Sequence, residues 1–219
     1  MRVGVFGGSF NPVHLGHLLV AEDAVKMLEL DWLLFVPTSI PPHRRDVSVP
    51  FDHRLCMVEL AVRAFKKTGV SAVERGCPGP SYTVRTLELL KRQFTRSSFY
   101  LIVGADQYAR IHTWHEPGRI TGLACIAVMS RPGIPHPPRF AEHPPDRVRF
   151  LDVVPVAIAA TTVRERVRAG RSFRYLVPSP VAAYIEEHRL YRDQAQRTSP
   201  QGRHVTENKL PGPGPEEVQ

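Results

Sequence analysis

The sequence predicts an α/β fold with a doubly wound, mainly parallel sheet, a short helical C-terminal part and a disordered tail. Short apolar runs, typical of strands buried on both faces, alternate with segments whose apolar residues recur at helical spacing. Glycine-containing and polar loops follow the strands, as expected where the carboxyl ends of parallel strands form a ligand crevice. We therefore expect one Rossmann-like domain over residues 1–192 and a disordered, Pro/Gly-rich tail over residues 193–219.

The composition is that of a globular protein. It is 42% hydrophobic and 23% charged, which argues against overall disorder. No apolar run approaches the roughly 20 residues that span a bilayer, and the N-terminus opens into a strand without a signal-peptide pattern. We expect a cytoplasmic protein without a membrane partner. Cys56, Cys77 and Cys125 lack the spacing of a disulfide framework or a metal site.

The formal net charge is +8, and all of it belongs to residues 1–193, because residues 194–219 hold three basic and three acidic side chains. A basic body is compatible with nucleic-acid binding, and equally with an enzyme that attracts polyphosphate substrates. The chain shows no basic run interleaved with aromatic residues and no recognition-helix signature. We therefore favour small anionic ligands and expect no nucleic-acid partner.

The first expected strand, Val3–Phe6, leads through a glycine loop into a helix that begins near Val13. Gly7 and Gly8 lack a Cβ, so the backbone can take positive φ and a bulky ligand can approach the main chain. The first N–H groups of the following helix have no intrahelical partner, and together with the helix dipole they favour an anion. The stretch is predicted to cradle a phosphate.

Two histidines stand at the start of that helix. His14 and His17 are three residues apart, so both imidazoles are expected on one helix face, which Gly16 keeps open to a ligand. Two imidazoles directed at one point suit a reaction in which negative charge develops on phosphoryl oxygens. Histidines at this spacing are also found at the surface or as metal ligands, but no further Cys or His stands at ligand spacing nearby. We expect a phosphate site and no protein-bound metal.

The next expected elements are a buried strand at Trp32–Val36, whose tryptophan should belong to the core, and a helix at Asp52–Lys67 closed by Gly69. Between them, two adjacent prolines keep the segment Thr38–Arg45 irregular. This loop leaves the carboxyl end of a strand, so Arg44 is a candidate phosphate contact. Exposed loop arginines are, however, more often only solvated.

A weak strand is expected at Val70–Val73, followed by a turn and a helix that starts near Ser81. Ser81 or Thr83 can serve as the N-cap of this helix, which accounts for one hydroxyl. Capping does not account for Tyr82 and Thr86, which are therefore further candidates for ligand contacts.

The next strand, Phe99–Val103, ends in Gly104 and Asp106. Gly104 lets a ligand approach the strand end, and Asp106 is placed to meet a ribose hydroxyl or a cationic group. Trp114 follows in a polar turn. Two interpretations of Trp114 stay open: a stacking plate for a flat ring, or a side chain packed over the edge of the core.

The remaining expected elements are two strands and two helices, at Ala124–Met129, Val148–Val154, Ile158–Val167 and Val181–His188. A proline-rich irregular segment separates the two strands. Thr161 or Thr162 is available to cap the first of these helices, whose N-terminus is a second place for an anion.

Six blocks of this sequence resemble, in order, those of the bacterial nicotinate-nucleotide adenylyltransferases, members of the His-x-Gly-His nucleotidyltransferase superfamily. The blocks are Gly7–His17, Pro41–Arg44, Pro80–Leu87, Gly104–Asp106 with Trp114, Ser130–Gly133 and Ile158–Arg164. The resemblance spans about residues 2–192. It departs from the family pattern at Ala159, where the family usually has a serine, so one hydroxyl of the phosphate site is missing.

The resemblance implies transfer of AMP from ATP to nicotinate mononucleotide, giving deamido-NAD and pyrophosphate, with Mg²⁺ on the ATP phosphates and no covalent intermediate. It implies that the catalytic residues are His14, His17 and Arg164. Residues implied to bind ATP are Gly7, Gly8, Ser9, Phe10, Gly104, Asp106 and Thr161. Residues implied to bind the mononucleotide are Arg44, Tyr82, Thr83, Thr86, Trp114 and Arg131.

Two alternatives stay open at this stage. One is an adenylyltransferase that uses nicotinamide mononucleotide, because backbone N–H groups that a sequence does not reveal can bind a carboxylate. The other is a basic nucleic-acid-binding protein, which predicts binding with a steep salt dependence and no release of pyrophosphate. The sequence leaves the oligomeric state undetermined.

Overall fold

The computed structural model describes residues 1–42, 49–130, 133 and 135–192. Its strands form one parallel sheet in the order β3-β2-β1-β4-β5-β6. They are β1 (Arg2–Gly8), β2 (Trp32–Pro37), β3 (Thr68–Val70), β4 (Ser98–Gly104), β5 (Ala124–Ser130) and β6 (Val148–Asp152). The order reverses between β1 and β4, and open α/β sheets bind ligands at the carboxyl ends of such strands. The predicted doubly wound α/β fold is confirmed.

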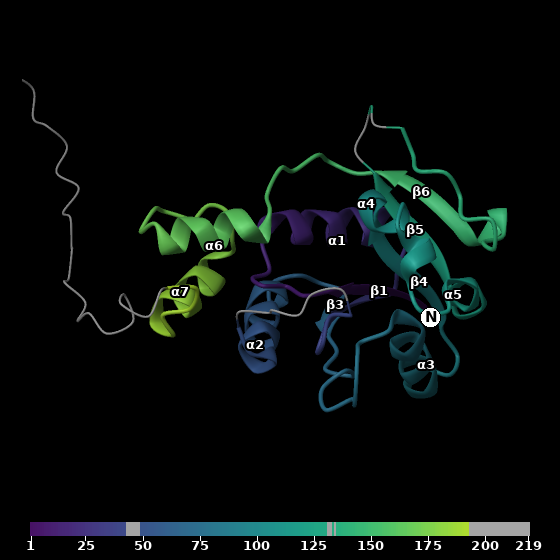
Figure 1. Ribbon diagram of the computed structural model, residues 1–219, viewed down its shortest axis with the longest axis horizontal. Helices are drawn as coiled ribbons and strands as arrows, with labels where there is room; N and C mark the ends of the chain where they lie inside the picture. The colour runs from purple at the N-terminus through teal and green to yellow at the C-terminus, as the bar shows by residue number, and fades with distance from the viewer. Residues whose placement is uncertain (43–48, 131–132, 134, 193–219) are drawn as a thin grey trace, which may run out of the picture.

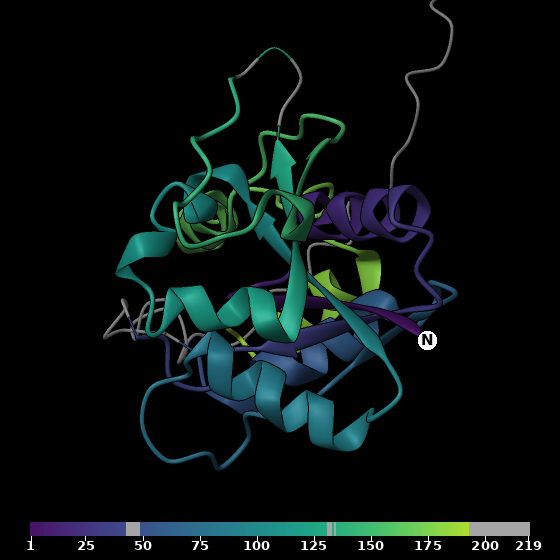
Figure 2. The same ribbon diagram turned by 90° about the vertical axis from the view of Figure 1, so that its right-hand side faces the viewer.

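Helices cover both faces of this sheet (Figures 1 and 2). They are α1 (Leu15–Met27), α2 (Phe51–Val62), α3 (Thr83–Gln93), α4 (Ala105–Tyr108), α5 (Pro117–Leu123), α6 (Ala160–Arg168) and α7 (Ser179–Glu187). One apolar cluster joins α1, α2, α6 and α7 to Leu33 and Phe35 of β2. The other joins α3 and α5 to Leu34 and Val36. Successive residues of β2 thus enter opposite cores, which explains its unbroken apolar sequence.

The predicted helical C-terminal part corresponds to α6 and α7. Figure 1 shows both helices beside α1 and α2, at the opposite end of the molecule from β6. The tail that the sequence predicts to be disordered, residues 193–219, lies outside the described residues. Within the described ranges, none of the helices combines the length and the apolar character needed to cross a membrane.

The helix predicted for Asp52–Lys67 is shorter than expected, because α2 ends at Val62. Phe65, whose apolar side chain extended the predicted pattern, packs against the core from a turn in which its N–H donates to the Val62 carbonyl at 2.9 Å. Gly69 therefore lies in β3 and does not close the helix. The predicted strand at Val70–Val73 is displaced accordingly, since β3 begins at Thr68.

Two predictions about single residues are also wrong. Trp32 is 39% exposed, because it stands at the start of β2 and its indole lies over Gly69 of the short edge strand β3, with one face toward solvent. Helix α6 has Ala159 as its N-cap, without a side-chain capping bond, so Thr161 and Thr162 lie inside the first turn.

Candidate active site

A cavity of about 1150 Å³ opens at the carboxyl ends of β1 and β4. It exceeds the roughly 300–1,000 Å³ of most small-molecule pockets, so its size suits two nucleotides side by side. The predicted site residues that line it are Gly7, Gly8, Ser9, Phe10, His14, His17, Tyr82, Thr83, Thr86, Gly104, Asp106 and Trp114. Segments between Val5 and Ile158 therefore meet at the switch point.

Two of the predicted residues that the structure describes stand apart from that cavity wall. Thr161 and Arg164 are in α6 and do not line the cavity, although Arg164 contacts the loop that does. Arg44 and Arg131 lie outside the described residues.

The glycine loop differs from its prediction in one respect. Gly7 and Gly8 end β1 without positive φ, and the residue in the left-handed region is Phe10, with φ 42°. A Cβ at Gly8 would lie 3.1 Å from the Phe10 ring, whereas a Cβ at Gly7 would meet nothing within 4 Å. Gly8 thus accommodates the buried Phe10, and the space above Gly7 stays open to a ligand.

The two histidines form a stacked pair at the start of α1. His14 is the N-cap and His17 the third helical residue, and their ring centroids are 3.6 Å apart with 28° between the planes. The backbone N–H of His14 donates to Nδ1 of His17 at 3.2 Å. A neutral His17 therefore carries its proton on Nε2 and can donate it. Gly16 is needed here, because its Cβ would lie 3.1 Å from Nδ1 of His14.

Burial controls the charge of this pair. It lowers the pKa of His14 to about 4. Burial, followed by repulsion from His14, also holds the pKa of His17 well below its usual value of 6.5. Both imidazoles are consequently neutral at pH 7 in the free protein. Nδ1 of His14 is buried without a hydrogen-bond partner among the described residues. An anion placed beside the pair would favour protonation.

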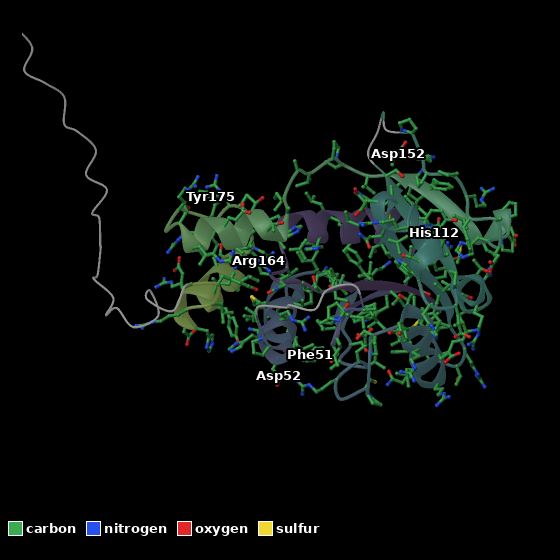
Figure 3. The ribbon with its side chains drawn as sticks, viewed as in Figure 1. Phe51, Asp52, His112, Asp152, Arg164 and Tyr175 are labelled. Atoms are coloured by element: carbon green, nitrogen blue, oxygen red, sulfur yellow. The ribbon has the colours of Figure 1, made fainter. Side chains whose placement is uncertain are left out.

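Two residues from the C-terminal part of the domain bind the loop between β1 and α1 at Asn11. Nη1 of Arg164 donates to the carbonyl of Asn11 at 2.7 Å, and the Tyr191 hydroxyl donates to Oδ1 of Asn11 at 2.9 Å. Burial raises the pKa of the Tyr191 hydroxyl, which stays protonated as the donor. Figure 3 places Arg164 on the side of α6 that faces α2 and the sheet. A cation from the end of the domain thus lies beside the glycine loop.

The opposite half of the cavity is aromatic. The Tyr82 ring stacks on His115, with centroids 4.2 Å apart and 23° between the planes. Trp114 packs against the core on the α3 face, as the second interpretation of this residue expects, and it also lines the cavity, where its role as a stacking plate stays a prediction. The structure adds His115 to the site. Its position next to Trp114 in a polar turn was the only signal for it in the sequence.

Thr86 lies in the cavity wall with its hydroxyl already bonded to a second lining residue, Glu74. The side chain is only 6% exposed, and its hydroxyl donates to Oε1 of Glu74 at 2.6 Å. Glu74 is itself buried, and sequence reasoning missed it because a single acidic residue before a turn looks like solvated surface.

At the end of β4, Gly104 makes room for Asp106. A Cβ at Gly104 would lie 2.7 Å from Oδ1 of Asp106, and Nε2 of Gln107 donates to Oδ2 at 2.9 Å. The carboxylate is thereby held over the strand end. Among the residues that the structure describes, no group of three or more His, Cys, Asp or Glu is arranged to hold a metal ion.

The chain is similar to a known family and to named proteins. A family profile described as cytidylyltransferase-like matches residues 5–169. A Thermus thermophilus protein named "Probable nicotinate-nucleotide adenylyltransferase" is 45% identical over 192 residues, covering 88% of this chain and 100% of that protein. A protein of the same name from Thermomicrobium roseum is 43% identical over 197 residues, covering 87% and 92%.

Solved structures with this fold include the nicotinic acid mononucleotide adenylyltransferase of Plasmodium falciparum. Its complex with NaAD gives a TM-score of 0.69 at 16% identity, covering 87% of this chain and 97% of that one. Its complex with APC gives a TM-score of 0.70 at the same identity. At this identity the similarity establishes the shared fold.

Proposed function

The chain belongs to the nicotinate-nucleotide adenylyltransferase family, and from this premise we propose that it transfers AMP from ATP to nicotinate mononucleotide, releasing pyrophosphate and deamido-NAD. One observation supports this most strongly: a single cavity joins the His14–His17 pair to the aromatic wall at Tyr82 and Trp114. Phosphate holders at one end and ring-stacking groups at the other suit a reaction between two nucleotides.

We assign the ATP to the half built by β1, α1 and β4. The triphosphate would lie over the open space at Gly7 and against the imidazole pair, with Arg164 beside the loop. Ser9 and Phe10 complete the loop wall. The adenosine would extend toward the end of β4, where Gly104 and Asp106 lie, and Thr161 is assigned to the phosphate end on the resemblance alone.

We assign the mononucleotide to the half formed by the segment Tyr82–Thr86 and by Trp114. A pyridine ring entering there would stack on an aromatic plate, and backbone N–H groups at the start of α3 would meet its carboxylate. Arg44 and Arg131, outside the described residues, are proposed contacts to its phosphate.

The chemistry is a direct displacement. A phosphate oxygen of the mononucleotide attacks the α-phosphorus of ATP, a new P–O–P bond forms, and the bond to the β-phosphate oxygen breaks to release pyrophosphate. Such transfers depend on alignment of the reacting groups and on stabilisation of the developing charge. Nε2–H of His17 and the cation of Arg164 would supply that stabilisation, with no covalent intermediate on the protein.

We propose that Mg²⁺ arrives as part of the ATP substrate. The described residues offer Asp106 as a cavity carboxylate but no cluster of ligands, so the phosphates themselves would supply the coordinating oxygens. Bound this way, the ion would offset charge on the departing pyrophosphate. Since ATP and pyridine mononucleotides are cytoplasmic metabolites, we expect the reaction to take place there.

Steady-state release of pyrophosphate, measured with ATP and either nicotinate or nicotinamide mononucleotide, tests this function. We expect a higher kcat/KM with the acid. A higher kcat/KM with the amide would reverse the choice of substrate. Absence of pyrophosphate with either mononucleotide, from a correctly folded protein, would reject the proposal.

A further inference from the structure

Two buried charged residues outside the assigned substrate contacts connect the two halves of the cavity. Arg54, in the first turns of α2, is 1% exposed and Glu74, after β3, is 7% exposed. Arginine and glutamate are almost never this deeply buried unless their polar groups are bonded. Their partners therefore indicate what they do.

Arg54 binds the backbone of the ATP half. Its Nη1 donates to the carbonyls of Ser9 and Thr38, each at 2.8 Å. Its Nε and Nη2 donate to the carbonyls of Val49 and Ser39 at 3.2 and 3.4 Å. One planar guanidinium thus fixes the glycine loop against the segment that follows β2.

Glu74 binds the same segment from the mononucleotide half. Its Oε2 accepts from the N–H of Ser39 at 3.0 Å, and its Oε1 accepts from the hydroxyl of Thr86 at 2.6 Å. Next to it, Ile40 and Ser81 pair in both directions: the N–H of Ser81 donates to the Ile40 carbonyl at 2.8 Å, and the Ile40 N–H donates to the Ser81 hydroxyl at 3.0 Å.

The segment Thr38–Ile40 is therefore the junction of both half-sites. The N–H of Thr38 also donates to the carbonyl of Gly8 at 2.8 Å. At Ser39 the carbonyl accepts from Arg54 while the N–H donates to Glu74, so a displacement on one side is transmitted to the other. We call this series, Ser9–Arg54–Ser39–Glu74–Thr86, the polar bridge.

We propose that Arg54 and Glu74 are positioning residues that hold the two nucleotides in register through the polar bridge. This inference rests on the proposed function. Each nucleotide would keep its own contacts without the bridge, but the attacking oxygen and the α-phosphorus would lose their alignment. Misplacement of about 1 Å can cost roughly 100-fold in rate.

Two conservative variants test the bridge, Glu74→Gln and Arg54→Lys. Glutamine keeps the shape of Glu74 but has an NH2 donor in place of one of its two acceptor oxygens, and lysine keeps the charge of Arg54 but not the planar fork. We expect kcat to fall by about 10- to 100-fold in each. The separate dissociation constants of ATP and of the mononucleotide should change by less than about threefold, because each half-site remains.

The double variant and a matched control complete the design. If both residues act through Ser39, the Glu74→Gln/Arg54→Lys protein should lose about as much kcat as the worse single variant. The control is Asp52→Asn, on the same helix α2 as Arg54, which breaks an exposed ion pair between Asp52 and Arg75. Figure 3 shows Asp52 on the outer side of α2. Its kcat and melting temperature should stay near wild type.

If the dissociation constant of one nucleotide rises by the same factor by which kcat falls, the inference is overturned. Arg54 and Glu74 would then only support one half-site. An unchanged kcat, or fully additive losses in the double variant, would also overturn it. Loss of melting temperature with unchanged kcat per folded molecule would indicate a structural role alone. Failure of the proposed function is distinguishable, since it would appear in the wild-type protein as absent pyrophosphate release.

Discussion

At the scale of single residues, the site depends on the neutrality of two stacked imidazoles. His14 and His17 lie too close, at 3.6 Å between ring centroids, for both to carry charge without a counter-ion. Burial lowers both pKa values and keeps the pair uncharged until an anion arrives. The free protein thus holds N–H donors at the proposed phosphate position without the cost of a buried cation pair.

Replacement of His17 by alanine should lower kcat by about 100-fold or more, because a donor to the transferring phosphate is lost in a site with little competing water. The fold should persist, since the ring is partly exposed to the cavity and α1 keeps its apolar face. Pyrophosphate release and circular dichroism measure the two effects. His188→Ala, at the exposed end of α7, is the matched control and should behave like wild type. Near-normal turnover of a folded His17→Ala protein would refute the assignment.

The low pKa of His14 also makes stability depend on pH. Its folded-state pKa of about 4 lies below the usual 6.5, so the unfolded chain binds the proton more readily. The contribution of His14 is therefore present in full above pH 6.5 and is lost as the pH falls toward 4. Between pH 7 and pH 5 the loss should be about 2 kcal/mol.

Urea unfolding of the wild-type and His14→Gln proteins at pH 7 and pH 5 measures this contribution of His14 to the free energy of unfolding. Glutamine does not titrate, so the variant should lose about 2 kcal/mol less free energy of unfolding over that interval than the wild type. Equal losses in the two proteins would show that His14 is not held neutral by burial.

At the scale of elements, the first turn of α1 has a glycine where helix stability would favour alanine. Gly16→Ala should stabilise the helix by up to about 1 kcal/mol, but the new Cβ would lie 3.1 Å from the His14 ring. We expect an unchanged or raised melting temperature together with a kcat lowered by about tenfold, because the ring must shift.

Gly122 provides the control for this variant. It lies in α5, and a Cβ there would meet nothing within 4 Å. Gly122→Ala should raise the melting temperature and leave kcat unchanged. Should Gly16→Ala keep full activity, the exact position of the His14 ring would not matter for turnover.

Hydrophobic periodicity predicts most elements of this chain, because the strands and helices bury the faces that their sequences indicate. It fails where an apolar side chain enters the core from a turn, as Phe65 does beyond the end of α2. It fails again at Arg54, a charged residue that occupies a core-facing position of the same helix. Arg54 is buried because loop carbonyls distant in sequence accept its hydrogen bonds, and no local pattern contains that information.

At the scale of the whole molecule, strand order brings the two half-sites together. The glycine loop and the Tyr82–Thr86 segment are far apart in the chain, and the switch between β1 and β4 makes them walls of one cavity. The sequence motifs predicted the loop, the histidine pair and the aromatic wall. Glu74 and His115 were missed because their roles depend on partners, Thr86 and Tyr82, that only the folded chain places beside them.

We propose that residues 1–192 form the nucleotidyltransferase domain. The Thermus thermophilus relative is matched along its full length by 88% of this chain, and the tail sequence has no core-forming pattern. Removal of residues 197–219 should therefore leave kcat/KM and the melting temperature unchanged. A large loss of activity in the truncated protein would show that the tail contributes to the reaction.

The most direct test of the account follows the phosphorus atoms of ATP. With ATP labelled at the α-phosphate and nicotinate mononucleotide present, we predict that the label enters the dinucleotide and that unlabelled pyrophosphate is released in equal amount. Label recovered as free AMP would contradict attack by the mononucleotide, and a label from the γ-phosphate recovered in the dinucleotide would contradict displacement at the α-phosphorus.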